Sequence, residues 1–348
     1  MGFSMKPKND VTREYYTHEV NPPKHSKDDR VLIVDGDILA YKLAAMGDER
    51  ACLVSRDGKT KEFKNKTEFK KLCLKNGWDY STFEKKDILK PKDVAPLIGS
   101  LKAALNNVLR DTGCTKYELY LGGSENFRLD LPLPEQYKSS RKDLLRPTHL
   151  NECKEYLIRH RGAKKIKGRE ADDYVQQRMY ELHKQGIDAV LYSNDKDARQ
   201  SLKHDIVIYN PDDSSIKTYK GGLGDLWLQP NGDLKGSGLK WLMSQCMLYD
   251  KIDNYIMNRH YLKNYGEKSL YKDFKDLKSE EEVLNKVVEK LTTLLPEYTE
   301  FTSWNGDSQK LNWLELMELY FQCAFMRIKD DDSTTFESLL IKYGVGYK

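Results

Sequence analysis

Long apolar runs are absent from this sequence of 348 residues: no stretch reaches the about 18 apolar residues that indicate a membrane-spanning helix. Internal repeats and low-complexity tracts are absent as well. Aromatic residues nevertheless make up 11% of the chain, and apolar residues recur at helix and strand spacing, which excludes disorder of the whole chain. The composition therefore predicts a packed protein that does not enter a membrane.

Cysteine and histidine are too scattered to suggest a metal site of their own. The six cysteines form no Cys-x-x-Cys pair, and none lies near a histidine at zinc-binding spacing. The seven histidines form neither His-x-His nor His-Glu-x-x-His. We therefore expect no zinc site, no disulfide framework, and reduced thiols in a cytoplasmic setting. A secretion signal is not expected either, since Lys6 and Lys8 stand where its apolar core would be.

Net charge of one sign is also nearly lacking, because 58 Lys and Arg face 54 Asp and Glu, which gives +4. This average conceals residues 137–169, where eleven Lys or Arg and three acids give a net charge of +8. A stretch of this kind is ordinarily a solvated helix face. Here it leads directly into the acidic Glu170, and positive charge beside such acids is what a phosphate-backbone substrate requires.

Alternating strand-like and helix-like segments predict an α/β fold with a mostly parallel central sheet. The run Val31–Val34 is typical of a buried strand, and we expect Asp37 to cap the helix after it. Residues 122–147 are rich in turn formers and charge and predict a long mobile segment. The other expected elements are a hairpin of 51–54 and 60–63 around Asp57-Gly58, strands at 117–121, 187–193, 206–209 and 216–219, and helices at 97–108 (closed by Gly113), 148–159, 170–182, 238–248 and over most of 276–348.

Carboxylates are the strongest chemical signal. They gather at Asp35, at Glu170 with Asp172 and Asp173, at Asp195 with Asp197, and at Asp250 with Asp253. The first and third groups follow predicted strands, whose carboxyl ends share the sheet edge where ligands bind. Each group alone is also typical of a helix start or a loop. Together, eight carboxylates would repel one another, so they require divalent cations, and oxygen ligands without His or Cys favour Mg²⁺ or Mn²⁺.

Five motifs in the sequence resemble those of the 5′ nucleases, the flap endonuclease family. This family includes bacteriophage 5′→3′ exonucleases and the 5′-nuclease domain of bacterial DNA polymerase I. The resemblance spans about residues 31–270, and we expect the phage branch to be nearest because no polymerase domain follows. The motifs are, in the family's order, Val34-Asp35-Gly36, Tyr137-Lys138-Ser139-Ser140-Arg141, Glu170-Ala171-Asp172-Asp173, Ser193-Asn194-Asp195-Lys196-Asp197 and Asp250-Lys251-Ile252-Asp253-Asn254.

The resemblance implies a domain organisation. Residues 31–220 would form a PIN-like α/β nuclease core, with a helical arch around 128–150. Residues 221–348 would form a helical C-terminal part that contains a helix–three-turn–helix DNA-binding element around 239–275. Residues 1–30 are expected to be a flexible N-terminal arm.

The resemblance also implies the roles of individual residues. Asp35 and Asp195 would be catalytic, together with Lys138 and Arg141, which would reach the scissile phosphate from the arch. The implied ligands of a first metal ion are Asp35, Glu170 and Asp172, and those of a second ion are Asp173, Asp195, Asp197, Asp250 and Asp253. The implied substrate contacts are Arg128, Tyr137, Lys142, Gly266 and Lys268. Two Mg²⁺ ions are expected, with Mn²⁺ as a substitute and K⁺ as a further candidate.

The sequence departs from the family pattern in two places. The stretch 121–125 lacks the family's aspartate before the arch, for which Glu125 and Asp130 are candidate replacements. The Gly-rich turn upstream of Gly266 is replaced by Ile256-Met257-Asn258-Arg259-His260.

The resemblance implies a monomeric, metal-dependent 5′→3′ exonuclease or flap endonuclease. It would act on 5′ ends, flaps and duplex DNA, leave 5′-phosphate products, and serve phage DNA replication or recombination in the infected host's cytoplasm. Two alternatives remain. One is an RNase H-like 5′ nuclease that removes RNA primers from RNA–DNA hybrids, and the other is a branched-DNA-binding protein of the same fold with little catalysis.

Overall fold

A computed structural model describes residues 29–123, 125–142 and 144–347, so most of the predicted N-terminal arm lies outside the described residues. Its central sheet has the strand order β6-β5-β1-β7-β8-β9, and every neighbouring pair is parallel except β8 and β9. The predicted α/β fold with a mostly parallel sheet is confirmed. The strands are β1 (Val31–Asp35), β5 (Lys116–Leu121), β6 (Lys164–Lys165), β7 (Ala189–Tyr192), β8 (Ile206–Asn210) and β9 (Ser215–Tyr219).

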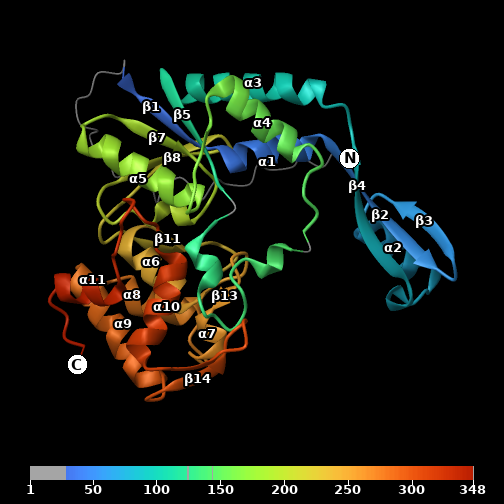
Figure 1. The fold of residues 1–348 in the computed structure, drawn as a ribbon. Helices are drawn as coiled ribbons and strands as arrows, with labels where there is room; N and C mark the ends of the chain where they lie inside the picture. Colours follow the sequence, from blue (N-terminus) through green and yellow to red (C-terminus); the bar gives the residue numbers. More distant parts are fainter. Residues whose placement is uncertain (1–28, 124, 143, 348) are drawn as a thin grey trace, which may run out of the picture.

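Helices cover both faces of this sheet because the side chains of β1 alternate between two apolar clusters. Leu32 and Val34 pack with α1 (Gly36–Met46), α3 (Ala95–Thr112) and α4 (Leu150–Arg161). Val31 and Ile33 pack on the opposite face with α5 (Ala171–Lys184). Figure 1 shows this layering in the upper half of the molecule. β1 is buried along its whole length, as its apolar run predicts.

The cap of α1 differs from the prediction. Asp35, not Asp37, is the N-cap, and its side chain accepts hydrogen bonds from the backbone N–H of Asp37 and Ile38 at 3.0 and 3.1 Å. The strand therefore runs directly into the helix without a linker. Asp37 instead pairs with Lys154 at 2.5 Å and accepts the N–H of Gly122 at 2.7 Å. At the end of α3, Gly113 closes the helix in a left-handed conformation, as predicted.

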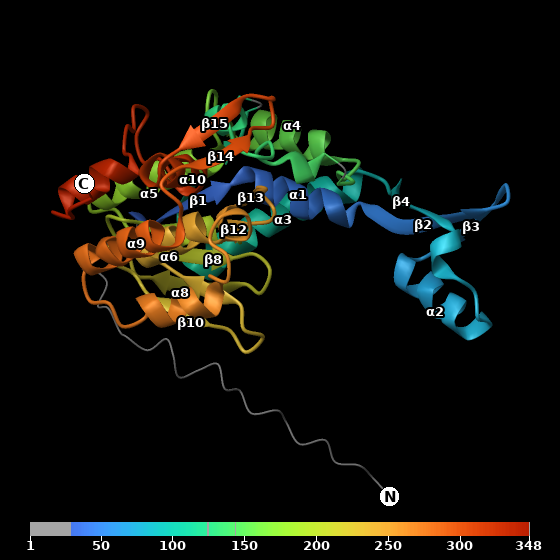
Figure 2. The ribbon, with the colours of Figure 1, turned by 90° about the horizontal axis from the view of Figure 1, so that it is seen from below.

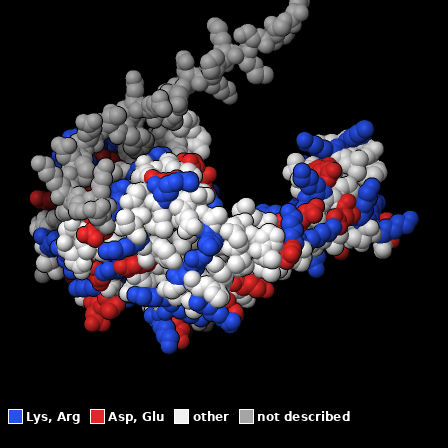
Figure 3. Space-filling view, turned by 90° about the horizontal axis from the view of Figure 1, so that it is seen from above, with Lys and Arg blue, Asp and Glu red and all other residues white. Residues whose placement is uncertain are grey.

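Residues 48–91 form a unit that the sequence predicted only in part, here called the projecting lobe. Its sheet has the antiparallel order β3-β2-β4, and α2 packs on one face through Phe69 and Cys73 against Cys52 and Val54. Figures 1 and 2 show the lobe standing away from the rest of the molecule, and Figure 3 shows Lys and Arg along it. The hairpin at Asp57-Gly58 is confirmed. The elements are β2 (Asp48–Arg56), β3 (Lys59–Phe63), α2 (Lys66–Asn76), the 3-10 turn Tyr80–Thr82 and β4 (Glu84–Pro91).

The C-terminal part has its own apolar core around α6, whose residues are all buried. Its described residues form the helices α6 to α11 and three two-stranded hairpins, and the hairpin of β14 and β15 interrupts the helical pattern predicted over most of 276–348. In the predicted helix–three-turn–helix region, α6 and α8 are separated by the hairpin β12–β13 and the short α7. Within the described chain, no helix is long and apolar enough to cross a membrane. The elements are β10 (Leu226–Leu228), β11 (Leu234–Gly236), α6 (Gly238–Met247), β12 (Tyr249–Asp250), β13 (Tyr255–Ile256), α7 (Met257–His260), α8 (Glu267–Phe274), α9 (Glu280–Leu294), β14 (Thr299–Thr302), β15 (Ser308–Leu311), α10 (Trp313–Ala324) and α11 (Phe336–Lys342).

The segment predicted as a mobile helical arch differs from the prediction. Between residues 125 and 149, its described residues form two 3-10 turns, Phe127–Asp130 and Ser139–Arg141, and no α-helix. Pro132 and Pro134 lack the N–H groups that a helix would need there. The segment is docked instead, because Leu133 and Tyr137 are buried in the C-terminal core.

Candidate metal centre

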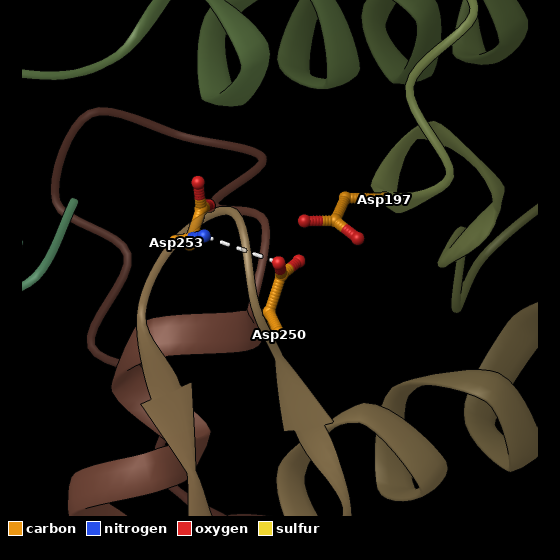
Figure 4. Close-up of side chains that lie close together, drawn as sticks. All are labelled: Asp197, Asp250 and Asp253. Atoms are coloured by element: carbon orange, nitrogen blue, oxygen red, sulfur yellow. Dashed lines mark hydrogen bonds between the residues drawn. The ribbon is translucent and has the colours of Figure 1, made fainter. Parts of the chain in front are cut away.

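Acidic side chains from four distant parts of the chain meet at the carboxyl edge of the sheet. Asp35 ends β1, and Asp195 and Asp197 follow β7. Glu170 is the N-cap residue of α5, so Asp172 and Asp173 lie in that helix's first turn, where the helix dipole favours negative charge. Asp250 ends β12 and Asp253 lies in the turn before β13, and Figure 4 shows this turn opposite Asp197.

Asp35, Asp172 and Asp195 form the first carboxylate group. Burial, with the neighbouring Asp37, raises the pKa of Asp35 to about 7. Burial, with the charges of Asp35 and Asp195, raises the pKa of Asp172 well above its usual value. Burial also raises the pKa of Asp195. These acids therefore repel one another in a dry environment, which is the situation that a cation relieves.

Asp197, Asp250 and Asp253 form the second carboxylate group. All three are buried, and one oxygen of each lies within 4.8 Å of the others, so they could hold one metal ion (Figure 4). Asp250 accepts the N–H of Ile252 at 2.7 Å and of Asp253 at 3.1 Å, which fixes the turn.

Two members of the second group, Asp250 and Asp197, differ in how readily they ionise. Burial works against ionisation of Asp250, but the ammonium of Lys196 at 2.8 Å outweighs it and lowers the pKa of Asp250. Burial and the charge of Asp195 raise the pKa of Asp197, which also accepts a hydrogen bond from Gln245. Lys196 stands inside the Asp195–Asp197 motif but was not among the predicted site residues, and no motif marks Gln245.

Lys138 and Arg141 lie against the acids rather than apart from them. Lys138 pairs with Glu170 and lies 4.0 Å from Asp253, while Arg141 pairs with Asp253 at 2.5 Å. Lys138 has a left-handed backbone, with φ of +59°, and its N–H donates to the carbonyl of Asp253 at 2.8 Å. Lys138 and Arg141 therefore neutralise Glu170 and Asp253.

Arg128 and Asp173 form a buried pair, which contradicts both of their predicted roles. The Arg128 side chain is 0% exposed, and its two terminal nitrogens donate to the two oxygens of Asp173, both at 2.8 Å. Arg128 also donates to the carbonyls of Cys323 and Phe325. Asp173 accepts the N–H of Arg327 as well. Arg128 has no surface left for substrate, and the oxygens of Asp173 are engaged by these donors instead of facing a metal site.

Tyr137 also lies in the wrong place for the predicted base contact. It is 2% exposed, its ring is part of the C-terminal core, and its hydroxyl donates to Asp253 at 2.8 Å. Lys142 is exposed and bonds to Gln136, and Gly266 and exposed Lys268 begin α8. These three stay predicted substrate contacts.

Neither candidate for the missing aspartate joins the carboxylate groups. Glu125 and Asp130 are both exposed. The additional acid beside the first group is Asp37, whose charge contributes to the raised pKa of Asp35. Its position two residues after Asp35 was the signal that could have identified it.

No protein-family model and no curated protein matches the chain. Among solved structures, it is similar to a mutant of the T5 5′-exonuclease, with 15% identity and a TM-score of 0.47 over 86% of this chain and 88% of that one. It is also similar to the zinc-bound T5 5′-exonuclease, with 16% identity and a TM-score of 0.46 over 85% and 88%. A third is the bacteriophage T5 flap endonuclease in a pseudo-enzyme–product complex with DNA and metal ions, with 13% identity and a TM-score of 0.49 over 90% and 97%.

Proposed function

We propose that this protein is a divalent-metal-dependent 5′ nuclease that hydrolyses DNA phosphodiesters. The observation that carries the proposal is the pair of carboxylate groups, three aspartates each, beside the basic Lys138 and Arg141. Hard oxygen ligands of this kind suit Mg²⁺ or Mn²⁺. The 5′ polarity and the DNA substrate rest on the order of the five motifs.

Asp197, Asp250 and Asp253 fit one ion, since one oxygen of each lies within 4.8 Å of the others, and we propose a second ion at the first carboxylate group because its acids raise one another's pKa. Asp35, Asp172 and Asp195, with Glu170, would hold one, and Asp197, Asp250 and Asp253 would hold the other. When bound, such ions supply an activated water and neutralise charge on the phosphate. The proposal keeps Mg²⁺ as the working ion, Mn²⁺ as its substitute and K⁺ as a further candidate.

The chain's own residues would then bind and orient the substrate. Divalent ions on Glu170 and Asp253 would compete with Lys138 and Arg141, which then become available to phosphate oxygens. The +8 segment 137–169 attracts the nucleic-acid backbone to this edge. The product carries a 5′-phosphate, and a monomer acting in the replication or recombination of phage DNA is the setting we propose.

The test is cleavage of 5′-labelled single-stranded, duplex, flap and RNA–DNA hybrid substrates with Mg²⁺, Mn²⁺ or EDTA. We expect metal-dependent products with a 5′-phosphate, and loss of turnover in Asp195→Asn with DNA binding retained. Asp276→Asn, which changes an exposed acid two residues after the end of α8, is the matched control and should cleave normally. Cleavage in EDTA, or no cleavage with either metal, would refute the proposal, and preference for the hybrid would favour primer removal.

A second candidate is a branched-DNA-binding protein of this fold with little catalysis. The observation that favours it is that neither Glu125 nor Asp130 joins the first carboxylate group. Tight binding to flap DNA in EDTA, without product when Mg²⁺ is added, would support it over the nuclease.

A further inference from the structure

A cavity of about 340 Å³ lies between α5, the loop 200–203, residues 325–334 and α11. None of its lining residues belongs to the carboxylate groups. Its volume falls at the lower end of the ~300–1,000 Å³ typical of small-molecule sites.

Four lysines from four separate segments line this cavity: Lys184, Lys203, Lys329 and Lys342. Within the described chain, no ion pair joins any of them to a carboxylate. Burial and the neighbouring ammonium of Lys342 lower the pKa of Lys203, so positive charge is concentrated there. Such a group of cations indicates an anionic ligand.

The one acid of the lining, Asp332, makes no ion pair with these lysines within the described chain, and its single charge, which favours the ammonium of Lys203, leaves the lining with a net positive charge. Asp332 is buried and accepts the N–H of Ile328 at 2.9 Å, the N–H of Thr334 at 3.2 Å and the hydroxyl of Thr334 at 2.7 Å. It therefore shapes the loop 328–334.

The interior of the cavity is suited to more than a bare anion. Phe325, Met326 and Leu339 give it buried apolar walls. Gln200 also lines it, is 3% exposed and donates to Gln245 at 2.6 Å, but its own Oε1 is buried without a partner. A buried acceptor of this kind requires an N–H donor.

We propose that this cavity binds a nucleoside 5′-phosphate. The base would lie against the apolar walls with one N–H toward Gln200, and the phosphate would lie among the lysines. A nucleotide combines these features in one small molecule: an apolar face, N–H donors and several negative charges. The cavity shares no lining residue with the carboxylate groups, although Gln200 is linked to Asp197 through Gln245, and the inference does not depend on the nuclease function.

Isothermal titration of the full chain in EDTA tests this site without contribution from bound divalent ions. The probes are dAMP, dATP, deoxyadenosine and inorganic phosphate. We expect saturable binding of dAMP, tighter binding of dATP, and weaker binding of the nucleoside and of phosphate. No saturable dAMP binding, or equal affinity for dAMP and phosphate, would overturn the proposal.

Variants then locate the site. Lys203→Gln with Lys342→Gln should weaken dAMP binding at least about tenfold, since charge-assisted hydrogen bonds are lost. Gln200→Leu should weaken dAMP but not phosphate. Lys102→Gln, an exposed lysine on α3, is the control. Unchanged dAMP binding in the double variant would overturn the location of the site. If hexa-aspartate displaces dAMP more effectively than dATP does, the ligand is an acidic peptide and the nucleotide proposal is wrong.

Asp195→Asn separates this inference from the nuclease proposal. It should lose cleavage but keep dAMP affinity. If dAMP binding disappears with Asp195→Asn, the nucleotide occupies the metal centre and the cavity proposal is wrong.

Discussion

At the scale of single residues, burial decides how the carboxylates of the metal centre behave. Asp35 is 2% exposed and has neighbouring acids, so its pKa rises from 3.8 to about 7 in the folded protein. The folded state therefore prefers the protonated acid. The destabilisation of the folded state by ionised Asp35 is absent below about pH 4, grows as pH rises, and is complete above about pH 7.

Asp35→Asn should consequently stabilise the metal-free protein. In EDTA at pH 8 we expect the free energy of unfolding to rise by about 1–3 kcal/mol, with a smaller gain at pH 5. Urea denaturation at both pH values measures it, with Asp276→Asn as the control. Mg²⁺ should stabilise the wild type more than the variant. A destabilised Asp35→Asn at pH 8 would contradict this account of the acid cluster.

The buried pair of Arg128 and Asp173 gives a second prediction at this scale. Arg128→Met leaves a buried, unpaired carboxylate and should cost about 3–5 kcal/mol of unfolding free energy. Asp173→Leu in the same chain should recover part of that loss. Arg159→Met is the matched control, because Arg159 and Glu155 pair at 3.0 Å with both side chains exposed and such pairs contribute about 0–1 kcal/mol. Equal losses in the two single variants, by urea denaturation, would argue against a structural role of Arg128.

His204 supplies a pH dependence that does not involve the metal centre. Burial, with the adjacent His183, lowers the pKa of His204 from 6.5 to about 4, while Asp205 opposes the shift. Because the folded state prefers the neutral ring, the stability that His204 contributes is present above pH 6.5 and is lost as pH falls toward 4. Between pH 6.5 and pH 4, His204→Gln should lose less unfolding free energy than the wild type, by up to about 3 kcal/mol. Urea denaturation across this range measures it, and identical slopes in both proteins would contradict the assignment.

At the scale of elements, the projecting lobe is joined to the rest of the protein at its base, where Asp48 accepts the N–H of Thr148 at 2.8 Å. The N–H of Lys92 donates to the carbonyl of Gly47 at 2.7 Å, so the chain leaves the lobe where it entered. The lobe's apolar cluster is its own and shares no buried residue with the other clusters. The lobe therefore has the structure of an insertion between α1 and α3.

Replacing residues 48–91 by a short Gly-Ser linker should leave the remaining protein folded. We expect a melting temperature within a few degrees of the full chain and cleavage of short oligonucleotides at a similar rate. The isolated lobe, in contrast, should be unfolded, since a chain of this size buries too little apolar surface. Far-ultraviolet circular dichroism and the cleavage assay measure both. Loss of folding in the shortened chain would show that the lobe supports the sheet.

Elements with strong local signals could be predicted from the sequence, and others could not. β1 has its apolar run, and α3 has a spaced apolar face and Gly113. β4 contains Lys85, Lys86 and Asp87, which hide any alternation of apolar and polar residues, so it was missed. The burial of Arg128 could not be foreseen, because the carbonyls it binds lie at residues 322–325, far along the chain. The acidic candidates could be named from the sequence because carboxylate chemistry is visible without the fold, although Asp37 was missed and Asp173 pairs with Arg128 instead; their role as metal ligands stays a prediction.

At the scale of the whole molecule, charge is divided among regions. Residues 137–169 carry +8 and the projecting lobe carries twelve Lys or Arg against eight acids, or +4. The total of +4 therefore leaves the rest of the chain at −8. We therefore expect a negatively charged substrate to be attracted to these two regions rather than to the surface as a whole.

DNA binding should accordingly weaken steeply with salt. Replacing the exposed Lys164, Lys165 and Lys167 by Gln should reduce the slope of log K against log salt by about 2 to 3 if each neutralises one phosphate. Fluorescence anisotropy with Asp195→Asn in EDTA, where we expect no cleavage, measures the slope from low to physiological salt. The exposed Lys278 and Lys310, replaced together by Gln, provide the comparison. An unchanged slope in the triple variant would place the DNA elsewhere.

Lys138 pairs with Glu170 and Arg141 pairs with Asp253, so a divalent ion that binds these acids would displace the two side chains. Lys138 and Arg141 neutralise these acids while no metal is bound, and each divalent ion that binds would release one of the two side chains. The released cation is the partner that a phosphate needs. Metal and DNA should therefore raise each other's affinity by the same factor, because a coupling between two binding sites is reciprocal. We therefore expect the protein to be folded without metal and to bind DNA more tightly once metal is bound.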